Sequence, residues 1–219
     1  MSDKKNKLHF STKSIHVGNK IDETGAAVTP IHFTSTFRQP TFASTEKYVY
    51  SRVGSPTLAA LEENLAMLEN AKYAYAFSSG MAAMTAIFMM FKPGDHVLIS
   101  RNVYGGVFRL VTKVLNDNKV DFEFIDTTNL DTVADAIKDN TKLIHLETPS
   151  NPLLELADIE KISKVTKKLN IPLLIDGCQF VPHKKINIKE IDPDFYVFSE
   201  GFPFGGQDSW WVGLGVCLM

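Results

Sequence analysis

The stretch "YAYAFSSGMAAMTAIFMMFKPGDHVLIS", residues 73–100, decides how the rest of the chain is interpreted. An apolar run at 73–77 has the length of a strand, Gly80 opens an apolar helical run to residue 91, and "KPGD" turns the chain into a second strand at 96–100. Parallel strands of one sheet are joined by a helical crossover of this kind. The stretch therefore predicts a β-α-β unit.

The same alternation continues toward the carboxyl terminus. The pattern predicts helices at 104–116, 129–138 and 158–169 and strands at 120–125, 142–147, 171–176 and 194–199. The strands are apolar almost throughout, as is typical of strands covered on both faces. We therefore expect an α/β fold with a mostly parallel sheet, helices on both faces, and 194–199 as the final strand.

The composition changes on both sides of this region. Residues 1–57 carry Thr, Ser, Pro and isolated aromatics without a sustained period, so we expect an extended N-terminal arm that contacts its own domain or another subunit. A helix at 56–68, with leucines at three- and four-residue spacing, leads into the α/β domain at 58–199. Residues 200–219 are aromatic and glycine-rich, which predicts a divergent tail.

Charge and composition restrict the classes of partner. A net charge of -2 and a pI near 6.3 give no basic face for a phosphate backbone, so no nucleic acid is expected. The longest apolar run, 81–91, is too short to span a bilayer, and the first residues do not read as a secretory signal. Cys178 and Cys217 have no disulfide-framework or C-x-x-C spacing. These features favour a cytoplasmic protein that binds small molecules and other protein chains.

The histidines and cysteines do not indicate a metal. The six histidines include no pair at metal-ligand spacing, so no metal site is expected. His145 lies inside a predicted strand, where a hydrogen-bonded core histidine is expected rather than a ligand.

Polar residues at the carboxyl ends of the predicted strands are the first candidates for a site, because ligands of parallel α/β folds bind there. In "SSGMAA" (78–83), the amides of Gly80 and Met81 would point free N–H groups at an anion such as a phosphate. The alternative is a tight strand-to-helix turn with Ser79 as the N-cap.

Two further candidates follow other strands. Asp176 closes an apolar strand, where an unpaired carboxylate is unfavourable, so it indicates a cation such as a protonated pyridine nitrogen. The alternative is an Asp that only forms a turn. Tyr104 has glycines beside it that leave room for a flat ring to stack on the phenol, although an ordinary half-buried tyrosine fits as well.

Loops supply the remaining candidates. Glu147 and Asn151 lie in "LETPSNP", where the Asn151 amide would reach an oxygen of a bound ring, unless the segment is plain turn chemistry. Tyr50 and Arg52 lie in the arm, and an Arg grips a phosphate bidentately, unless the arm is simply solvated.

Six stretches, "TGAAVTPIHFTSTF", "YVYSRVGSPT", "SSGMAA", "VYGG", "ETPSNP" and "LLID", resemble in order and spacing the cysteine and methionine metabolism family of pyridoxal-phosphate enzymes, which includes cystathionine γ-synthases and cystathionine lyases. The resemblance covers nearly all of residues 9–199. It implies the large domain of the pyridoxal-phosphate-dependent transferase fold type I, similar to aspartate aminotransferase. It also implies pyridoxal 5'-phosphate as cofactor, a sulfur amino acid as substrate, transsulfuration by β- or γ-elimination or γ-replacement, and a homo-oligomer, either a dimer or a tetramer.

The resemblance also implies roles for the candidates. The cofactor phosphate is assigned to five residues, the last two from a partner subunit: Gly80, Met81, Ser199, Tyr50 and Arg52. The pyridine ring is assigned to the stacking and expected catalytic residue Tyr104, to Asp176 at the ring nitrogen and to Asn151 at the ring hydroxyl, with Glu147 shaping the site beside it. An Asp there keeps the nitrogen protonated, which makes the ring an electron sink.

The sequence departs from the family pattern directly after Ser199. Relatives have a Thr or a similar residue and then the lysine that forms the Schiff base, whereas this chain has Gly201 and Phe202 at those places. A benzyl side chain can neither react with the cofactor aldehyde nor transfer protons. Lys184 or Lys185 would substitute only if their loop folded back over the cofactor.

Other departures concern the substrate. "GCQF" follows Asp176 where relatives have an Asn-Thr-Phe type of sequence, which would alter the wall behind the ring. Relatives continue with the rest of the sheet and a C-terminal domain, which supplies an arginine for the substrate carboxylate, so a truncated chain without that domain is expected. Gly106, where some methionine lyases carry a cysteine, favours a cystathionine synthase or lyase.

Several functional hypotheses stay open at this point. The first is a transsulfuration lyase or transferase, and the second is a catalytically inactive module that binds pyridoxal phosphate without a covalent bond. The third is the product of a frameshifted or prematurely terminated gene, suggested by the loss of pattern at Glu200. A nucleotide-binding Rossmann protein is disfavoured, because no G-x-G-x-x-G follows the first strand.

Overall fold

The fold is described from a computed structural model that covers residues 8–44, 46–181, 183, 187–200 and 214–219. The chain divides into two units, Met1–Ala74 and Tyr75–Met219, and each is described by itself. The domain boundaries expected after residues 57 and 199 remain predictions.

The described residues of the first unit form the helices α2 (Phe10–His16) and α3 (Pro56–Glu69). The predicted helix at 56–68 is confirmed as α3, which begins after the N-cap Ser55 with a proline in its first turn and ends at a left-handed Asn70. Helix α2 contradicts the expectation of a wholly extended arm. Its seven residues are too few to display a repeating apolar pattern in the sequence.

The second unit is built on a sheet of seven described strands. These are β1 (Ala74–Phe77), β2 (His96–Ser100), β3 (Asp121–Ile125), β4 (Thr141–Glu147), β5 (Leu173–Asp176), β6 (Phe195–Glu200) and β7 (Leu214–Leu218), in the spatial order β1-β7-β6-β5-β4-β2-β3. The pairs β3–β2, β2–β4, β4–β5 and β5–β6 are parallel. The predicted α/β fold with a mostly parallel sheet is therefore confirmed.

Strand β7 corrects the expectation that 194–199 is the last strand. It runs antiparallel to β6, with Gly215 opposite Ser199, and lies between β6 and β1. Strand β6 is therefore paired on both of its sides, with β5 and with β7. The sequence reading missed β7 because its short apolar run directly follows a glycine-rich stretch that suggested irregular structure.

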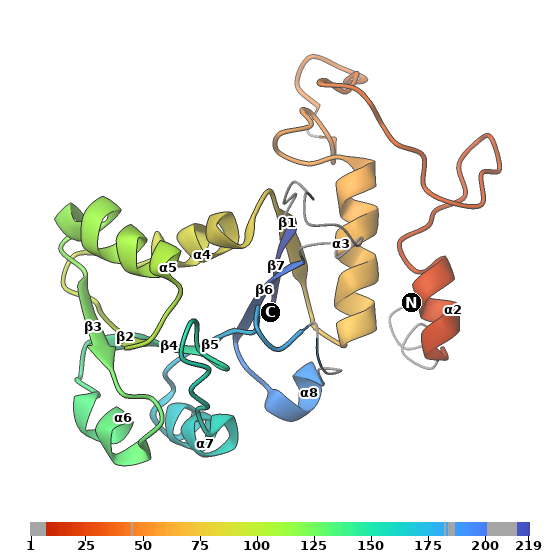
Figure 1. Cartoon of the computed structure of the whole chain (residues 1–219). Helices are drawn as coiled ribbons and strands as arrows, with labels where there is room; N and C mark the ends of the chain where they lie inside the picture. Colours follow the sequence, from red (N-terminus) through yellow and green to blue (C-terminus); the bar gives the residue numbers. More distant parts are fainter. Residues whose placement is uncertain (1–7, 45, 182, 184–186, 201–213) are drawn as a thin grey trace, which may run out of the picture. The chain divides into compact units, whose positions relative to one another are not determined.

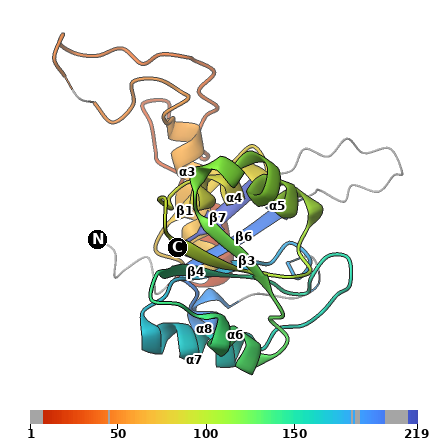
Figure 2. The same cartoon turned by 90° about the vertical axis from the view of Figure 1, so that its left-hand side faces the viewer.

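Helices cover both faces of this sheet, as Figures 1 and 2 show from two directions. On one face lie α4 (Gly80–Phe88) and α5 (Gly105–Arg109), and on the other lie α6 (Leu130–Ala136), α7 (Ile159–Leu169) and α8 (Ile188–Ile191). Helix α4 ends three residues earlier than predicted. No helix in the described part of the chain has the length and apolar character needed to cross a membrane.

The helix predicted at 104–116 is divided. After α5 the chain forms a π-helical turn, Leu110–Val114, and then a 3-10 turn, Asn116–Asn118. The amide of Leu115 donates to the carbonyl of Leu110, five residues back. With this wider spacing Leu115 lies on the buried side with Leu110 and Val111, whereas Val114 is 68% exposed.

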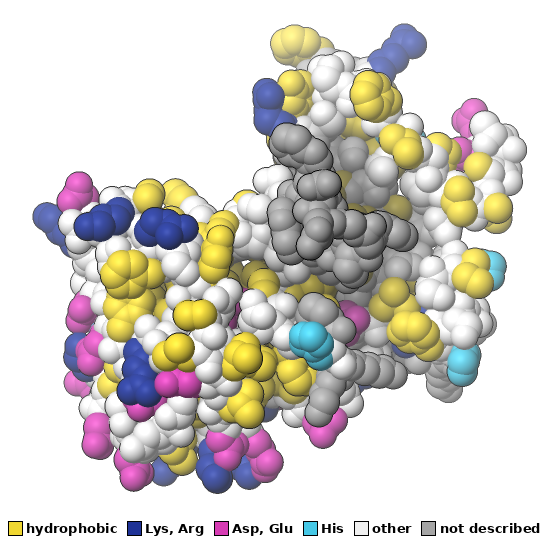
Figure 3. All heavy atoms as spheres, in the orientation of Figure 1, with side chains coloured by type: hydrophobic (Ala, Val, Ile, Leu, Met, Phe, Trp, Pro, Cys, Tyr) yellow, Lys and Arg dark blue, Asp and Glu magenta, His cyan; other side chains and the backbone are white. Residues whose placement is uncertain are grey.

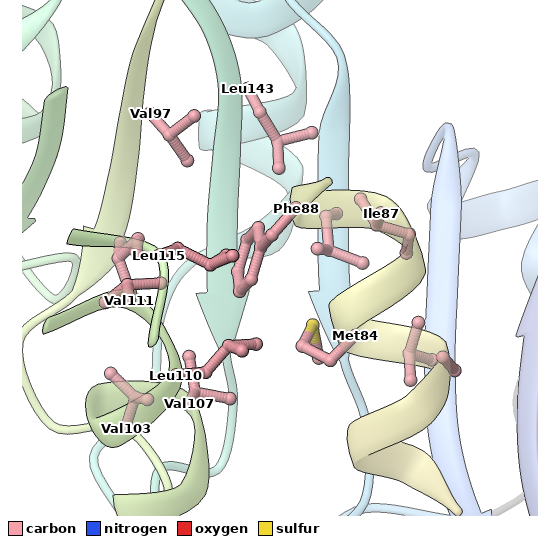
Figure 4. Close-up of a cluster of buried hydrophobic side chains, with 14 of the residues drawn as sticks. Met84, Ile87, Phe88, Val97, Val103, Val107, Leu110, Val111, Leu115 and Leu143 are labelled. Atoms are coloured by element: carbon pink, nitrogen blue, oxygen red, sulfur yellow. The ribbon is translucent and has the colours of Figure 1, made fainter. Parts of the chain in front are cut away.

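The core lies between the sheet and the α4–α5 face. In Figure 4, Phe88 extends from α4 toward Leu115, while Val97 and Leu143 approach from the strands. Burial of each such side chain contributes about 1.5–3 kcal/mol relative to exposure. His145 also lies in this region, with its ring centroid 5.9 Å from that of Phe88. His145 is the expected core histidine, but among the described residues neither ring nitrogen has a hydrogen-bond partner, so the expected hydrogen bond is not found.

Gly177, directly after β5, has no room for a side chain, because a Cβ there would overlap the phenol group of buried Tyr196. We expect Gly177→Ala to lower the free energy of unfolding by about 1–3 kcal/mol, the usual range for overpacking. Denaturant unfolding of Gly177→Ala, Tyr196→Ala and the double variant measures the coupling. Gly54→Ala is the matched control, since its Cβ would have its nearest neighbour 4.0 Å away. If the changes in the free energy of unfolding caused by Gly177→Ala and Tyr196→Ala were strictly additive in the double variant, the clash would be refuted.

Candidate functional site

The carboxyl ends of β4, β5 and β6 bring most of the predicted site residues to one edge of the sheet. Glu147 pairs in register with Asp176, and Asp176 with Val197, two residues before Ser199. The sheet changes winding direction between β2 and β4, and ligands of parallel α/β sheets bind at such a point.

The amino end of α4 lies against Ser199. A Cβ on Gly80 would come 3.0 Å from the Ser199 Cβ, so only glycine fits without a shift of the neighbour. The Ser79 side chain caps the helix by accepting from the Ala82 amide at 3.1 Å. The predicted N-cap is therefore present, yet it does not use the amides of Gly80 and Met81. Among the described residues no acceptor is found for these two N–H groups, which therefore can bind an anion.

Two buried carboxylates lie side by side at the strand ends. Glu147 is 3% exposed and Asp176 is 5% exposed. Burial and then the charge of Asp176 raise the pKa of Glu147 to about 7. Burial likewise raises the pKa of Asp176, although hydrogen bonds from Cys178 oppose the shift. Within the described ranges no lysine, arginine or histidine forms an ion pair with either carboxylate, so the pair favours a cationic ligand.

Tyr104 lies next to this pair. Its backbone N–H donates to Glu147 Oε2 at 2.6 Å, and its side chain is about half exposed. Its ring lies over Gly106, where a Cβ would overlap the ring and come 2.9 Å from the sulfur of Met81. The open face of the phenol is thus available to a flat ligand.

Asn151 follows β4 in a loop that is fixed at several points. Its backbone N–H donates to Glu147 Oε1 at 2.9 Å. Farther along, the Glu155 carboxylate accepts from Arg101 at 3.0 Å and from the Asn102 side chain at 2.6 Å. These contacts tie the loop to the residues that follow β2.

Cys178 connects the end of β5 to the end of β6, a link that was not predicted from the sequence. Its N–H donates to Asp176 Oδ1 at 3.0 Å, and the Ser199 N–H donates to its sulfur at 3.2 Å. Burial, with the charge of Asp176, raises the pKa of the thiol well above its usual range, so the group remains protonated. The departure at "GCQF" marks this position in the sequence, but no sequence pattern predicts a contact between Cys178 and Ser199.

The remaining predicted residues belong to the first unit or lie outside the described residues. Tyr50 and Arg52 belong to the first unit, where the guanidinium carbon lies 4.5 Å from the Tyr50 ring centroid. Their expected role across subunits stays a prediction. Phe202, Gly201, Lys184 and Lys185 lie outside the described residues.

A second cluster of titratable groups lies at the opposite edge, where the strands begin. His96 Nε2 is 3.1 Å from Glu123, and Asp121 is nearby. The Lys138 ammonium lies 2.7 Å from Glu123 and 3.1 Å from Asp121, and therefore supplies the positive charge that a metal would otherwise bring.

On the face in Figure 3, described acidic and basic side chains of the second unit are interspersed, unlike the single-sign field of a nucleic-acid surface.

Comparisons with known proteins identify relatives. The sequence model of the family described as "Cys/Met metabolism PLP-dependent enzyme" matches residues 11–197. The chain is 44% identical over 173 residues to a cystathionine gamma-lyase of Bacillus subtilis, covering 78% of this chain and 46% of that protein. It is 40% identical over 206 residues to a cystathionine beta-lyase of Lactococcus lactis, covering 94% of this chain and 54% of the relative.

Solved structures of similar proteins have the same fold as this chain. The metB protein of Corynebacterium glutamicum superposes with a TM-score of 0.84 at 38% identity, covering 98% of this chain and 56% of that one. The cystathionine gamma-lyase of Lactobacillus plantarum complexed with L-serine gives a TM-score of 0.84 at 38% identity, covering 96% of this chain and 55% of that structure. The chain thus spans about half the length of the relatives it matches.

Proposed function

Because the chain belongs to the family of Cys/Met metabolism pyridoxal-phosphate-dependent enzymes, we propose that it binds pyridoxal 5'-phosphate at the ends of β4, β5 and β6. The buried pair Glu147 and Asp176 carries this proposal, because two adjacent carboxylates without a cationic partner among the described residues favour a ligand that brings positive charge. A protonated pyridine nitrogen supplies that charge on a flat ring.

The residues present fit the cofactor. In the proposal Asp176 holds the proton on the ring nitrogen, Tyr104 stacks on the ring and Asn151 faces its hydroxyl group. The phosphate is bound by free amides, a hydroxyl and two residues of a partner subunit, namely Gly80, Met81, Ser199, Tyr50 and Arg52. When bound, pyridoxal phosphate supplies an electron sink for carbanions of amino acid substrates.

The proposed substrate class is a sulfur amino acid of the cystathionine type. The named relatives are cystathionine lyases and synthases, which supports a transsulfuration reaction for the whole protein. Gly106 supports the same choice, since its hydrogen is all that fits beneath the Tyr104 ring. A cysteine at this position, as in some methionine lyases, would need the ring to shift.

Phe202 favours a second candidate function, a binding module without catalysis. We propose that Phe202 occupies the place of the lysine that binds the cofactor covalently, so binding by this chain is reversible and the lysine's proton transfers are lost. Either a natural inactive relative or a frameshifted or truncated gene product would have this sequence. The other two reading frames of the coding DNA distinguish these, since a frameshift leaves a Ser-x-Thr-Lys continuation in one of them.

The test is a titration of the purified chain with pyridoxal phosphate, followed by borohydride reduction and peptide mass analysis. We expect saturable binding with an induced circular dichroism signal from the cofactor, and no adduct on any single lysine. One specific adduct on Lys184 or Lys185 would overturn the reversible mode and restore a covalent enzyme. No saturable binding would overturn the cofactor site itself.

A further inference from the structure

We propose that Glu147 is a positioning residue that fixes the backbone of Tyr104 and of Asn151 at the same time, one with each carboxylate oxygen. The effect that we expect on cofactor binding rests on the proposed function. The two contacts themselves are present in the chain without cofactor. We call these two contacts the Glu147 clamp.

The geometry of the clamp joins three segments of the chain. Glu147 is the last residue of β4 and is almost fully buried. Its Oε2 accepts the N–H of Tyr104 at 2.6 Å, and its Oε1 accepts the N–H of Asn151 at 2.9 Å. Tyr104 is the N-cap residue of α5, and its own N–H donates to Glu147 rather than to another backbone group among the described residues. The Glu147 side chain thereby sets the distance between the start of α5 and the loop after β4.

Only an ionised carboxylate can serve both amides equally. The two N–H groups donate to different oxygens of Glu147, and hydrogen bonds to a charged oxygen are roughly twice as strong as those to a neutral one. A protonated or amidated side chain would place its own donor against one of the two N–H groups. The titratable groups that act on Glu147 are Asp176 at the end of β5 and Cys178 just after it.

Loss of the contact to Glu147 would also move the Tyr104 ring, which is proposed to stack on the cofactor. The Tyr104 ring is confined by Gly106 beneath it and by the nearby sulfur of Met81, so the ring follows its own backbone. Met81 is the second residue of α4, whose amino end is the proposed phosphate site. Glu147 therefore positions the two groups proposed to hold the ring, Tyr104 and Asn151, without touching the ring itself.

Amide measurements on the cofactor-free chain test the clamp. In Glu147→Gln we expect hydrogen exchange at one of the two amides, Tyr104 or Asn151, to accelerate at least tenfold, while the β4 amides stay protected. Glu160→Gln, an exposed acid-to-amide change on α7, is the matched control and should alter neither. Unchanged protection of both amides in a folded Glu147→Gln protein would overturn the proposal.

A second measurement needs no variant. In the unmodified chain the amide proton resonances of Tyr104 and Asn151 should shift together with one midpoint near pH 7, where burial and Asp176 place the pKa of Glu147. Separate midpoints, or no titration, would refute the clamp even if Glu147→Gln fails to fold.

Cofactor affinity separates this proposal from the proposed function. We expect Glu147→Gln to weaken pyridoxal phosphate binding about tenfold, the loss of one hydrogen bond to a charged group. Normal binding by Glu147→Gln with unchanged amides would refute the clamp and leave the cofactor site intact. Clamped amides in a chain that binds no pyridoxal phosphate would refute the cofactor site and leave the clamp intact.

Discussion

Asp176→Asn is expected to make the cofactor-free protein more stable and, at the same time, to weaken pyridoxal phosphate binding by two or more orders of magnitude. The carboxylate is 5% exposed, burial raises its pKa, and it forms no ion pair with a described cationic side chain. Removal of that charge should raise the free energy of unfolding by roughly 1–3 kcal/mol. The amide oxygen can still accept the N–H of Cys178.

The loss of affinity follows from the proposed contact. A buried pair broken on one side costs about 3–5 kcal/mol, which corresponds to at least two orders of magnitude in a dissociation constant. Denaturant unfolding without cofactor and a fluorescence titration with pyridoxal phosphate measure the two effects. Asp126→Asn is the matched control, since this partly exposed acid at the end of β3 pairs with Arg101 and should leave binding unchanged. If Asp176→Asn lost both stability and affinity, Asp176 would have a structural role instead of the proposed one. Unchanged affinity would show that Asp176 does not contact the ring nitrogen.

The sheet was predictable from the sequence because its strands are fully covered. All five residues of β2 are buried, and the apolar run at 97–99 within it stands out against amphipathic helices such as α7. Helix α2 was missed because seven residues are too few to establish a helical period, and strand β7 was missed because it directly follows a glycine-rich stretch. The division of the helix after Tyr104 depends on which residues the sheet buries, which no local propensity encodes.

The edge of the sheet that holds the site was predictable for a topological reason. Parallel strands end on the same side, so residues as distant in sequence as Gly80 and Ser199 were expected together, and they are. The Glu147 clamp and the Cys178 link were not predictable, because both involve backbone amides whose placement depends on the paths of loops. His145 shows the same limit, since a sequence does not reveal whether a buried ring finds a partner.

His145→Leu is expected to stabilise the protein, and to do so more strongly as the pH falls. The imidazole is fully buried and neither ring nitrogen has a partner in the described part of the chain, so its replacement by an apolar side chain should add about 1–3 kcal/mol near pH 7. Burial also lowers the pKa of His145 from 6.5 to about 4. The folded state thus binds this proton less readily than the unfolded state does. The native histidine therefore costs stability progressively as pH falls from about 6.5 toward 4, and the variant does not.

Glu147 gives the stability of the native protein a pH dependence of the opposite sign, so His145 has to be measured as a difference between the variant and the native protein. Its folded pKa of about 7 lies above the model-peptide value of 4.5, so its contribution favours the fold at low pH and is lost as pH rises through that window. Between about pH 4.5 and 6.5 the two groups oppose each other in the native protein. His145→Leu leaves Glu147 alone, so we expect its advantage over the native protein to grow by about 2–3 kcal/mol from pH 7 to pH 4.5.

Urea unfolding of both proteins at several pH values measures this advantage, and the difference cancels the carboxylates that both share. His183→Leu, at an exposed position of the same unit, is the control and should show no growth of the difference. A pH-independent gap would mean that the proton of His145 does not contribute to stability. A variant less stable than the native protein at every pH would mean that the imidazole is satisfied in solution, and that β4 carries a polar contact beneath Glu147.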